Sequence, residues 1–296
     1  MKHKLFSMST ARAAIAGAAV IGIVVAFVGT LDEVERVPLP SLPRLVFAAV
    51  LLVAGQLAAL GGWSVLIPAG TTRALAPGYF LAQLAKYVPG SVWQGVGQVM
   101  DAVRLGSGRG AATVAYMVQM VTQTVAGFVL ASLVLLARPS GWLLAAAIVS
   151  PLSVVLLNRR WMQLALRLLS RVSPGRLGHL SDTVVDQASI LRAAGLTLVA
   201  MLLISLSFPV LLLGEVGARA VLAAAGAFSL SWVIGLLVVP VPSGLGIREL
   251  VLVGALGGDH GTAAVLAAAV VLRLLVIVVE GLLALMSRMV PAPART

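Results

Sequence analysis

Apolar segments long enough to cross a lipid bilayer recur along the whole of this chain. A transmembrane helix needs roughly 20 such residues, and 60% of the 296 residues are hydrophobic while only 10% are charged. A water-soluble domain cannot hide that much hydrocarbon, because polar groups must cover its large surface. The sequence therefore predicts one all-α integral membrane domain over residues 1–296, a polytopic transmembrane helical bundle in the cell membrane.

The charge pattern and the missing residue types exclude several classes of function. A net charge of +11, carried by arginines between apolar segments, is typical of basic cytoplasmic loops rather than of nucleic-acid binding. There is no cysteine, and His3, His179 and His260 lie outside any metal-ligand spacing. No phosphate-binding glycine-rich loop of the ATPase type is present. We expect no nucleic-acid partner, no metal and no cofactor.

The first apolar segment, Thr10 to Leu31, is predicted to be a membrane span whose N-terminus is cytoplasmic. Lys2, Lys4 and Arg12 precede or open it, and basic residues favour the cytoplasmic side. A secretory signal is the alternative, but the apolar run is longer than usual and no A-x-A site closes it. The acidic, proline-terminated loop that follows is expected outside, so residues 1–41 form the first span and an outside loop.

The order of a long span, an interrupted segment and a second long span occurs twice. In the first unit, residues 42–137, these are Leu42–Ile67, Ala74–Gly106 and Ala111–Ala137. In the second unit, residues 192–296, these are Arg192–Leu213, Ala220–Gly257 and Thr262–Met289. Proline and glycine break each middle segment, so each is predicted to be a re-entrant hairpin of two half-helices that meet at a tip.

Residues 138–191 link the two units and contain the most basic part of the chain. A linking span, Trp142–Leu157, is followed by a segment in which apolar residues recur at helical spacing and arginines share the opposite face. The apolar residues are Trp161, Leu164, Ala165, Leu168, Leu169 and Val172, and the arginines are Arg160, Arg167 and Arg171. This pattern predicts an amphipathic helix on the anionic inner leaflet, with anchoring favoured over substrate recruitment.

The basic linking segment also orients the two units. Once it is placed in the cytoplasm, the first hairpin enters from inside, the second enters from outside, and both termini are cytoplasmic. The units then form an inverted repeat, and paired broken segments in two halves point to a central transport site. The alternative stays open that the tips are ordinary loops and that Ala220–Val239 is a full span.

The two tips resemble a known family. The residues concerned run from Lys86 to Gln94, KYVPGSVWQ, and from Pro240 to Glu249, PVPSGLGIRE, and Arg273 fits the same pattern. The chain resembles the lysylphosphatidylglycerol synthase transmembrane, or flippase-like, family from roughly Leu42 onward. The resemblance implies a lipid flippase or a partner of enzymes that modify lipid headgroups. We expect a membrane domain without a synthase domain, so aminoacyl-phosphatidylglycerol is not carried over as the substrate.

Five charged residues within or beside apolar segments are the main candidates for a site. Such charges cost several kcal/mol in hydrocarbon and normally face a cavity or a partner. Lys86 and Arg248 are predicted to meet a lipid phosphate near half-helix ends. Glu249 is the natural counter-charge of Arg248 or Arg273, although Arg248 and Glu249 as a structural pair remain an alternative. Arg273 and Glu280 are two turns apart, so each should face another helix. The two residues would serve either substrate binding and proton coupling or structural pairing.

The other predicted substrate-binding residues lie at the tips. They are Tyr87, Pro89, Gly90, Trp93, Gln94, Pro242, Gly244 and Gly246. The prolines and glycines either free backbone groups for a ligand or only end the helices, and Tyr87, Trp93 and Gln94 either line a cavity or anchor the chain at the interface. The glutamines in or beside spans are expected to bond neighbouring helices. They are Gln56, Gln83, Gln98, Gln119 and Gln123.

The sequence predicts a membrane flippase or permease that moves an anionic phospholipid or a polyprenyl-phosphate-linked lipid between leaflets. Its partners would be membrane lipids and a lipid synthase or glycosyltransferase. One alternative is an integral membrane glycosyltransferase that uses a lipid-phosphate sugar donor, with Asp32, Glu33 or Glu35 as the acidic group. The other is a non-catalytic scaffold for a lipid-modifying enzyme.

Overall fold

A computed structural model describes residues 39–86, 93–136, 153–172, 185–212, 217–237 and 246–289, and these residues are all-helical apart from short connections. The α-helices are α3 (Leu42–Leu66), α4 (Thr72–Ala85), α5 (Trp93–Arg104), α6 (Arg109–Ala131), α8 (Arg159–Val172), α10 (Gln187–Leu212), α11 (Ala218–Leu237), α12 (Ile247–His260) and α13 (Thr262–Met289). Two short 3₁₀ helices are η1 (Ser132–Leu136) and η2 (Val155–Leu157). The predicted first span and most of the predicted linking span lie outside the described residues.

Among the described residues, five helices are long and apolar enough to cross a membrane. They are α3, α6 with its extension into η1, α10, α11 and α13. The prediction of an all-helical chain with several helices able to span a membrane is therefore confirmed over the described residues. Helix α11 has 20 residues, so its length fits the alternative in which Ala220–Val239 is a full span.

The remaining helices of the two units are too short to cross. Helices α4 and α12 have 14 residues each and α5 has 12. At about 1.5 Å per residue, they are about 18–21 Å long, whereas the hydrocarbon core is about 30 Å thick. These short helices flank the two segments, 87–92 and 238–245, that lie outside the described residues and contain the predicted tips.

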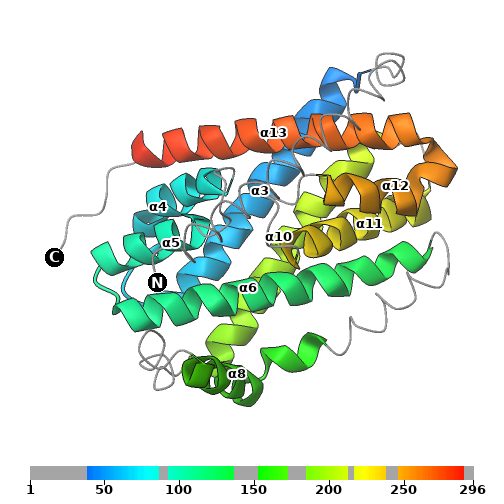
Figure 1. Ribbon diagram of the computed structural model, residues 1–296. Helices are drawn as coiled ribbons and strands as arrows, with labels where there is room; N and C mark the ends of the chain where they lie inside the picture. Colours follow the sequence, from blue (N-terminus) through cyan, green and yellow to red (C-terminus); the bar gives the residue numbers. More distant parts are fainter. Residues whose placement is uncertain are drawn as a thin grey trace, which may run out of the picture.

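Helices α3 and α10 pack against one another at the centre of the bundle. Figure 1 shows α13 on one side of this crossed pair and α6 on the other, with α4 and α5 towards one end and α11 and α12 towards the other. Helix α4 packs on α5 and α13, while α11 packs on α12 and α6. The central pair thus separates two smaller groups of helices.

Glycines let α3 and α10 approach closely. A Cβ atom at Gly55 would lie 2.6 Å from Ile204 Cγ1 and 3.0 Å from the carbonyl oxygen of Ala200. Two turns later, a Cβ at Gly62 would lie 3.1 Å from Thr197 Oγ1. Small residues at such crossings allow the backbone contact on which helix association in membranes depends.

The buried apolar residues form two large clusters, one towards each end of the central pair. The first joins parts of α3, α10 and η1 to α11, α12 and α13, and includes Leu52, Phe208 and Leu230. The second joins other parts of α3 and α10 to α4 and the first half of α6, and includes Trp63 and Tyr79. Because both clusters share α3 and α10, the space between them is enclosed by helices from both units.

Helix α8 has the amphipathic character that its spacing predicts. Met162 is buried in the second cluster, whereas Trp161, Leu164 and Leu168 are exposed apolar side chains. The start of α8 is fixed to α10, because the backbone N–H of Arg159 donates to Gln187 Oε1 at 2.7 Å. Its exposed apolar face has the form expected of a helix in the membrane interface.

We predict that Gly55→Ala destabilises the bundle and that Gly195→Ala does not. The new methyl group at position 55 meets the backbone of α10, and such overpacking costs about 1–3 kcal/mol. Gly195 is the matched control in α10, because a Cβ there has no atom within 4 Å. Thermal unfolding of the purified variants in detergent measures both effects. Equal midpoints would contradict the close α3–α10 contact.

Candidate functional site

A cavity of about 340 Å³ lies between the two apolar clusters and is lined by residues of all eight helices of the two units. Its apolar wall includes Leu52, Ile204 and Phe228. Five charged side chains also line it, namely Lys86, Arg248, Glu249, Arg273 and Glu280. The cavity therefore brings together the charged residues that the sequence singled out, from the end of α4, the first turn of α12 and the middle of α13.

Lys86 and Glu280 form one ion pair in this cavity. The ammonium group of Lys86, at the end of α4, donates a hydrogen bond to Glu280 Oε1 of α13. The same oxygen accepts a hydrogen bond of 2.8 Å from Gln56 Nε2 of α3. The Glu280 side chain is fully buried, whereas that of Lys86 is 27% exposed. Two donors from two other helices thus compensate a carboxylate that is removed from solvent.

Arg273 and Glu249 form the second ion pair. Arg273 Nη1 of α13 lies 2.8 Å from Glu249 Oε1, in the first turn of α12. The other carboxylate oxygen, Glu249 Oε2, accepts a 2.8 Å hydrogen bond from the backbone N–H of Gly246. Gly246 has a φ of 78°, a conformation that glycine adopts without strain. Both oxygens of Glu249 are therefore engaged, one by a cation and one by the start of its own helix.

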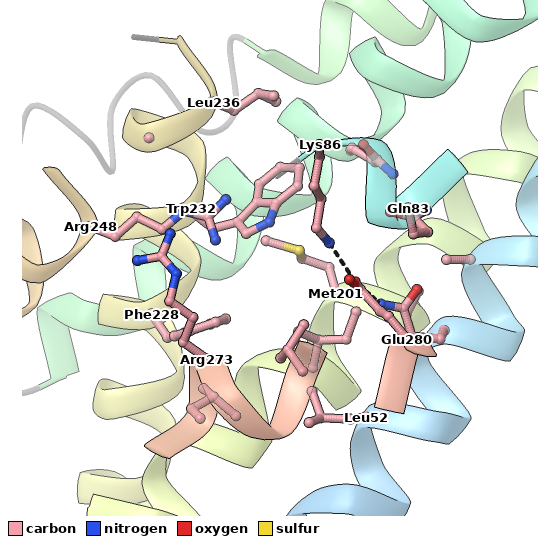
Figure 2. Close-up of a pocket in the computed structure, with 18 of the residues that line it drawn as sticks. Leu52, Gln83, Lys86, Met201, Phe228, Trp232, Leu236, Arg248, Arg273 and Glu280 are labelled. Carbon is pink, nitrogen blue, oxygen red and sulfur yellow. Dashed lines mark hydrogen bonds and ion pairs between the residues drawn. The ribbon is translucent and has the colours of Figure 1, made fainter. Parts of the chain in front are cut away.

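Arg248 lies beside this second pair and packs on an aromatic ring. Its guanidinium carbon is 5.8 Å from the ring centroid of Trp232 in α11, within the range of a cation–π contact. Figure 2 shows Arg248 and Arg273 on one side of the cavity and Lys86 with Glu280 on the other, with Trp232 between the two sides. The cavity thus has two charged ends.

Both ends meet α13 near its middle. Arg273 is the twelfth and Glu280 the nineteenth of the 28 residues of this helix. Seven residues separate them by about 10 Å along the axis, which explains why each has its partner on another helix rather than in the other. This separate pairing confirms the prediction made from their spacing.

Beyond Lys86 at the end of α4, the wall formed by α4, α5 and α6 is polar but uncharged, and we call it the uncharged wall. It contains the side chains of Tyr79, Gln83, Gln94, Tyr116 and Gln123. Gln94 Nε2 donates a 3.0 Å hydrogen bond to Gln83 Oε1 and so joins α5 to α4. Gln94 is the second residue of α5, as Arg248 is the second residue of α12.

The structure brings six of the predicted site residues together in the cavity, namely Lys86, Gln94, Arg248, Glu249, Arg273 and Glu280. Gly246 caps α12 behind Glu249. Trp93 does not line the cavity; its side chain is 49% exposed, on a face of α5 shared with Val96 and Met100. The remaining predicted residues, Tyr87, Pro89, Gly90, Pro242 and Gly244, lie outside the described residues.

Several lining residues were not predicted to belong to a site. Trp232, Tyr79 and Tyr116 lie in apolar or mixed helical segments in which aromatic residues are common core residues. They can be identified as lining residues only once the arrangement of the helices around the cavity is known. Gln56 was predicted to bond a neighbouring helix, and its bond to Glu280 confirms this.

No group of three or more His, Asp or Glu side chains in the described ranges could hold a metal ion. No protein-family model, curated protein or solved structure matches this chain. The resemblance of the two tip motifs to a known family therefore stays a prediction, and the cavity is the feature from which a function can be inferred.

We predict that Lys86→Met destabilises the protein and that adding Glu280→Gln restores part of the loss. The single substitution leaves a buried carboxylate without its cation, at a cost of about 1–3 kcal/mol once the partial exposure of Lys86 is allowed for. The double variant removes both charges. Thermal unfolding in detergent gives the comparison, with Arg160→Met on exposed α8 as control. A double variant less stable than Lys86→Met would contradict the pairing as the source of the effect.

Proposed function

We propose that this chain is a lipid flippase or permease, in which the phosphate-bearing headgroup of an anionic phospholipid or polyprenyl-phosphate lipid crosses through the cavity while the tails stay in the bilayer. The observation that carries the proposal is the position of two cations, one beside each of the two broken segments. Both line the same cavity, next to the middle of α13, a helix long enough to span the membrane. Lys86 ends α4 beside the first break, and Arg248 begins α12 after the second. Charges at this depth are typical of substrate pathways.

The helix contacts support an inverted repeat. When α3, α4, α5 and α6 are exchanged with α10, α11, α12 and α13, each substantial contact among these eight helices has a counterpart. Thus α4 on α5 corresponds to α11 on α12, and α4 on α13 corresponds to α11 on α6. This is the arrangement on which many transporters build a central site at the repeat interface.

The pairing with α13 supports re-entrant tips. Lys86 and Glu249 flank the two breaks, and their partners Glu280 and Arg273 lie in the middle of α13. Short helices that end at this depth cannot have crossed the bilayer. In our proposal, the first hairpin enters from the cytoplasm and the second from outside, and the cell membrane is the location.

The chemistry of the cavity fits a lipid phosphate. Arg248 lies in the first turn of α12, where the free backbone N–H groups and the helix dipole favour an anion. Arg273 adds a second guanidinium on the same side (Figure 2). A volume of about 340 Å³ is near the lower end of small-molecule sites, about 300–1,000 Å³, and is suited to a headgroup rather than to acyl tails. Glu280 is the candidate for proton coupling.

We predict that Asp259 faces outward and Arg288 faces the cytoplasm. Asp259 lies three residues before α13 and Arg288 lies in its last turn. The 28 residues of this helix, at about 1.5 Å per residue, exceed the bilayer core, so the two residues lie on opposite sides. The chain has no cysteine, so Asp259→Cys and Arg288→Cys can be labelled individually in intact cells with a membrane-impermeant maleimide. Labelling of position 288 but not 259 from outside would invert the proposed orientation.

We predict that Arg248→Gln slows translocation of an anionic lipid roughly tenfold, because a charge-assisted hydrogen bond contributes about 1.5–3 kcal/mol. Arg248→Lys should restore the rate only partly, since a point charge cannot reproduce the two-pronged contact. The measurement is dithionite quenching of acyl-labelled phosphatidylglycerol in proteoliposomes. Arg167→Gln on α8 is the control and should transport normally. Equal rates for Arg248→Gln and this control would remove Arg248 from the site.

A further inference from the structure

The two sides of the cavity differ in chemistry: one carries two guanidinium groups and a carboxylate, and the other carries the Lys86–Glu280 ion pair beside a group of uncharged hydrogen-bonding side chains. Arg248, Glu249 and Arg273 come from α12 and α13, whereas the tyrosines and glutamines of α4, α5 and α6 form the opposite wall. Figure 2 shows Gln83 beside Lys86, across the cavity from Arg248. Because Lys86 and Glu280 pair with each other, a ligand that contacts both sides meets net charge at one end and uncharged polar groups at the other.

The uncharged wall has hydrogen-bonding capacity that the protein leaves unused. The Tyr79 hydroxyl is buried near the side chains of Gln83 and Gln119, yet it makes no hydrogen bond of ordinary geometry. The Gln94–Gln83 bond uses one donor and one acceptor, so the amino group of Gln83 and the carbonyl of Gln94 remain for a further partner. Buried polar groups are nearly always satisfied, and because these side chains line the cavity, a ligand there can supply the missing partners.

The charged residues of the cavity are unsuited to a cationic headgroup. Glu280 is held by Lys86 and Gln56, and both oxygens of Glu249 are engaged by Arg273 and Gly246. The carboxylates are thus already compensated, and the lining contains three cations against two anions. The face of Trp232, the natural aromatic site for an ammonium group, is already occupied by Arg248. An added ammonium group would meet net positive charge without a free counter-charge.

We infer that the cavity selects lipids with an uncharged polyhydroxylated headgroup on a phosphate, such as a glycerol, inositol or sugar phosphodiester, and excludes cationic headgroups. This inference rests on the proposed function and narrows its substrate class. The phosphate lies at Arg248 and Arg273. The hydroxyl groups bond to Tyr79, Gln83 and Gln94, because a hydroxyl both donates and accepts and so satisfies amide groups of either kind. A site built to bond hydroxyls discriminates strongly against ligands that lack them.

The test compares acyl-labelled lipids in proteoliposomes of the full chain. Phosphatidylglycerol and phosphatidylinositol should cross at least tenfold faster than phosphatidylmethanol, which has the same monoanionic phosphodiester but no hydroxyl group. Phosphatidylethanolamine, phosphatidylcholine and lysyl-phosphatidylglycerol should remain slowest. Faster movement of phosphatidylglycerol than of phosphatidylinositol, or the reverse, identifies the size of headgroup. Equal rates for phosphatidylglycerol and phosphatidylmethanol, or fastest movement of the lysylated lipid, would overturn the inference and leave the flippase proposal standing.

A variant links the selectivity to the uncharged wall. Gln83→Met should reduce phosphatidylglycerol transport more than phosphatidylmethanol transport, so that the ratio of the two rates approaches one. Gln163→Met, on α8 away from the cavity, is the matched control. Loss of both rates in Gln83→Met with an unchanged melting midpoint would instead mark Gln83 as general to transport and overturn its role in headgroup selection.

A second measurement separates failure of this inference from failure of the proposed function. A ligand that binds the folded state raises its melting midpoint, so each lipid is also added to the protein in detergent. If no lipid crosses above the protein-free rate but phosphatidylglycerol and phosphatidylinositol stabilise more than phosphatidylmethanol, the headgroup site stands and the transport proposal fails. If no lipid crosses and all stabilise equally, both fail and the uncharged wall holds only water.

Discussion

Two opposite charges in the long apolar helix α13 impose the constraint on which the rest of the site depends. Arg273 and Glu280 sit in a segment whose other residues favour hydrocarbon, and an unpaired charge there is expensive. Two helical turns keep them from neutralising one another. Each must therefore find a counter-charge on another helix, and the structure provides Glu249 from α12 and Lys86 from α4. The pairing places the ends of two short helices against the middle of a long one.

The central pair of helices makes that arrangement sterically possible. Gly55 and Gly62 bring α3 and α10 to close contact, so the two units share one axis while each keeps its own apolar cluster. The groups that meet between the clusters are those that neither cluster can bury without a partner: amides, phenols and ions. The cavity thus lies between the two apolar clusters, and it is lined by the polar groups because apolar side chains fill the regions on either side of it.

The sequence predicted the parts of this structure that depend on local pattern. The span Leu42–Ile67 agrees with α3 within one residue, and Thr262–Met289 agrees with α13. Helix α10 begins at Gln187, five residues before the predicted start at Arg192. The arginine does not mark the start of the helix, because its long side chain can extend from within a helix to solvent. Which side chains meet was harder to predict. Lys86 was expected to meet a phosphate, yet its ammonium group bonds to Glu280, and nothing in the sequence marked Trp232. Such contacts depend on how the helices are rotated against one another.

The separate pairing also gives the proposed transport cycle a physical basis. A phosphate that binds Arg273 shares its guanidinium group with Glu249 Oε1, whose companion oxygen accepts a hydrogen bond from the backbone N–H of Gly246 at the start of α12. Occupancy of the site is therefore linked to the anchoring of the second broken segment. The Lys86–Glu280 pair, two turns along α13, is separate from this contact and keeps the first segment attached. A direct bond between Arg273 and Glu280 would have attached neither broken segment to α13. Two separate ion pairs attach the two segments independently. Alternating access requires this independence, because one side must stay closed while the other opens.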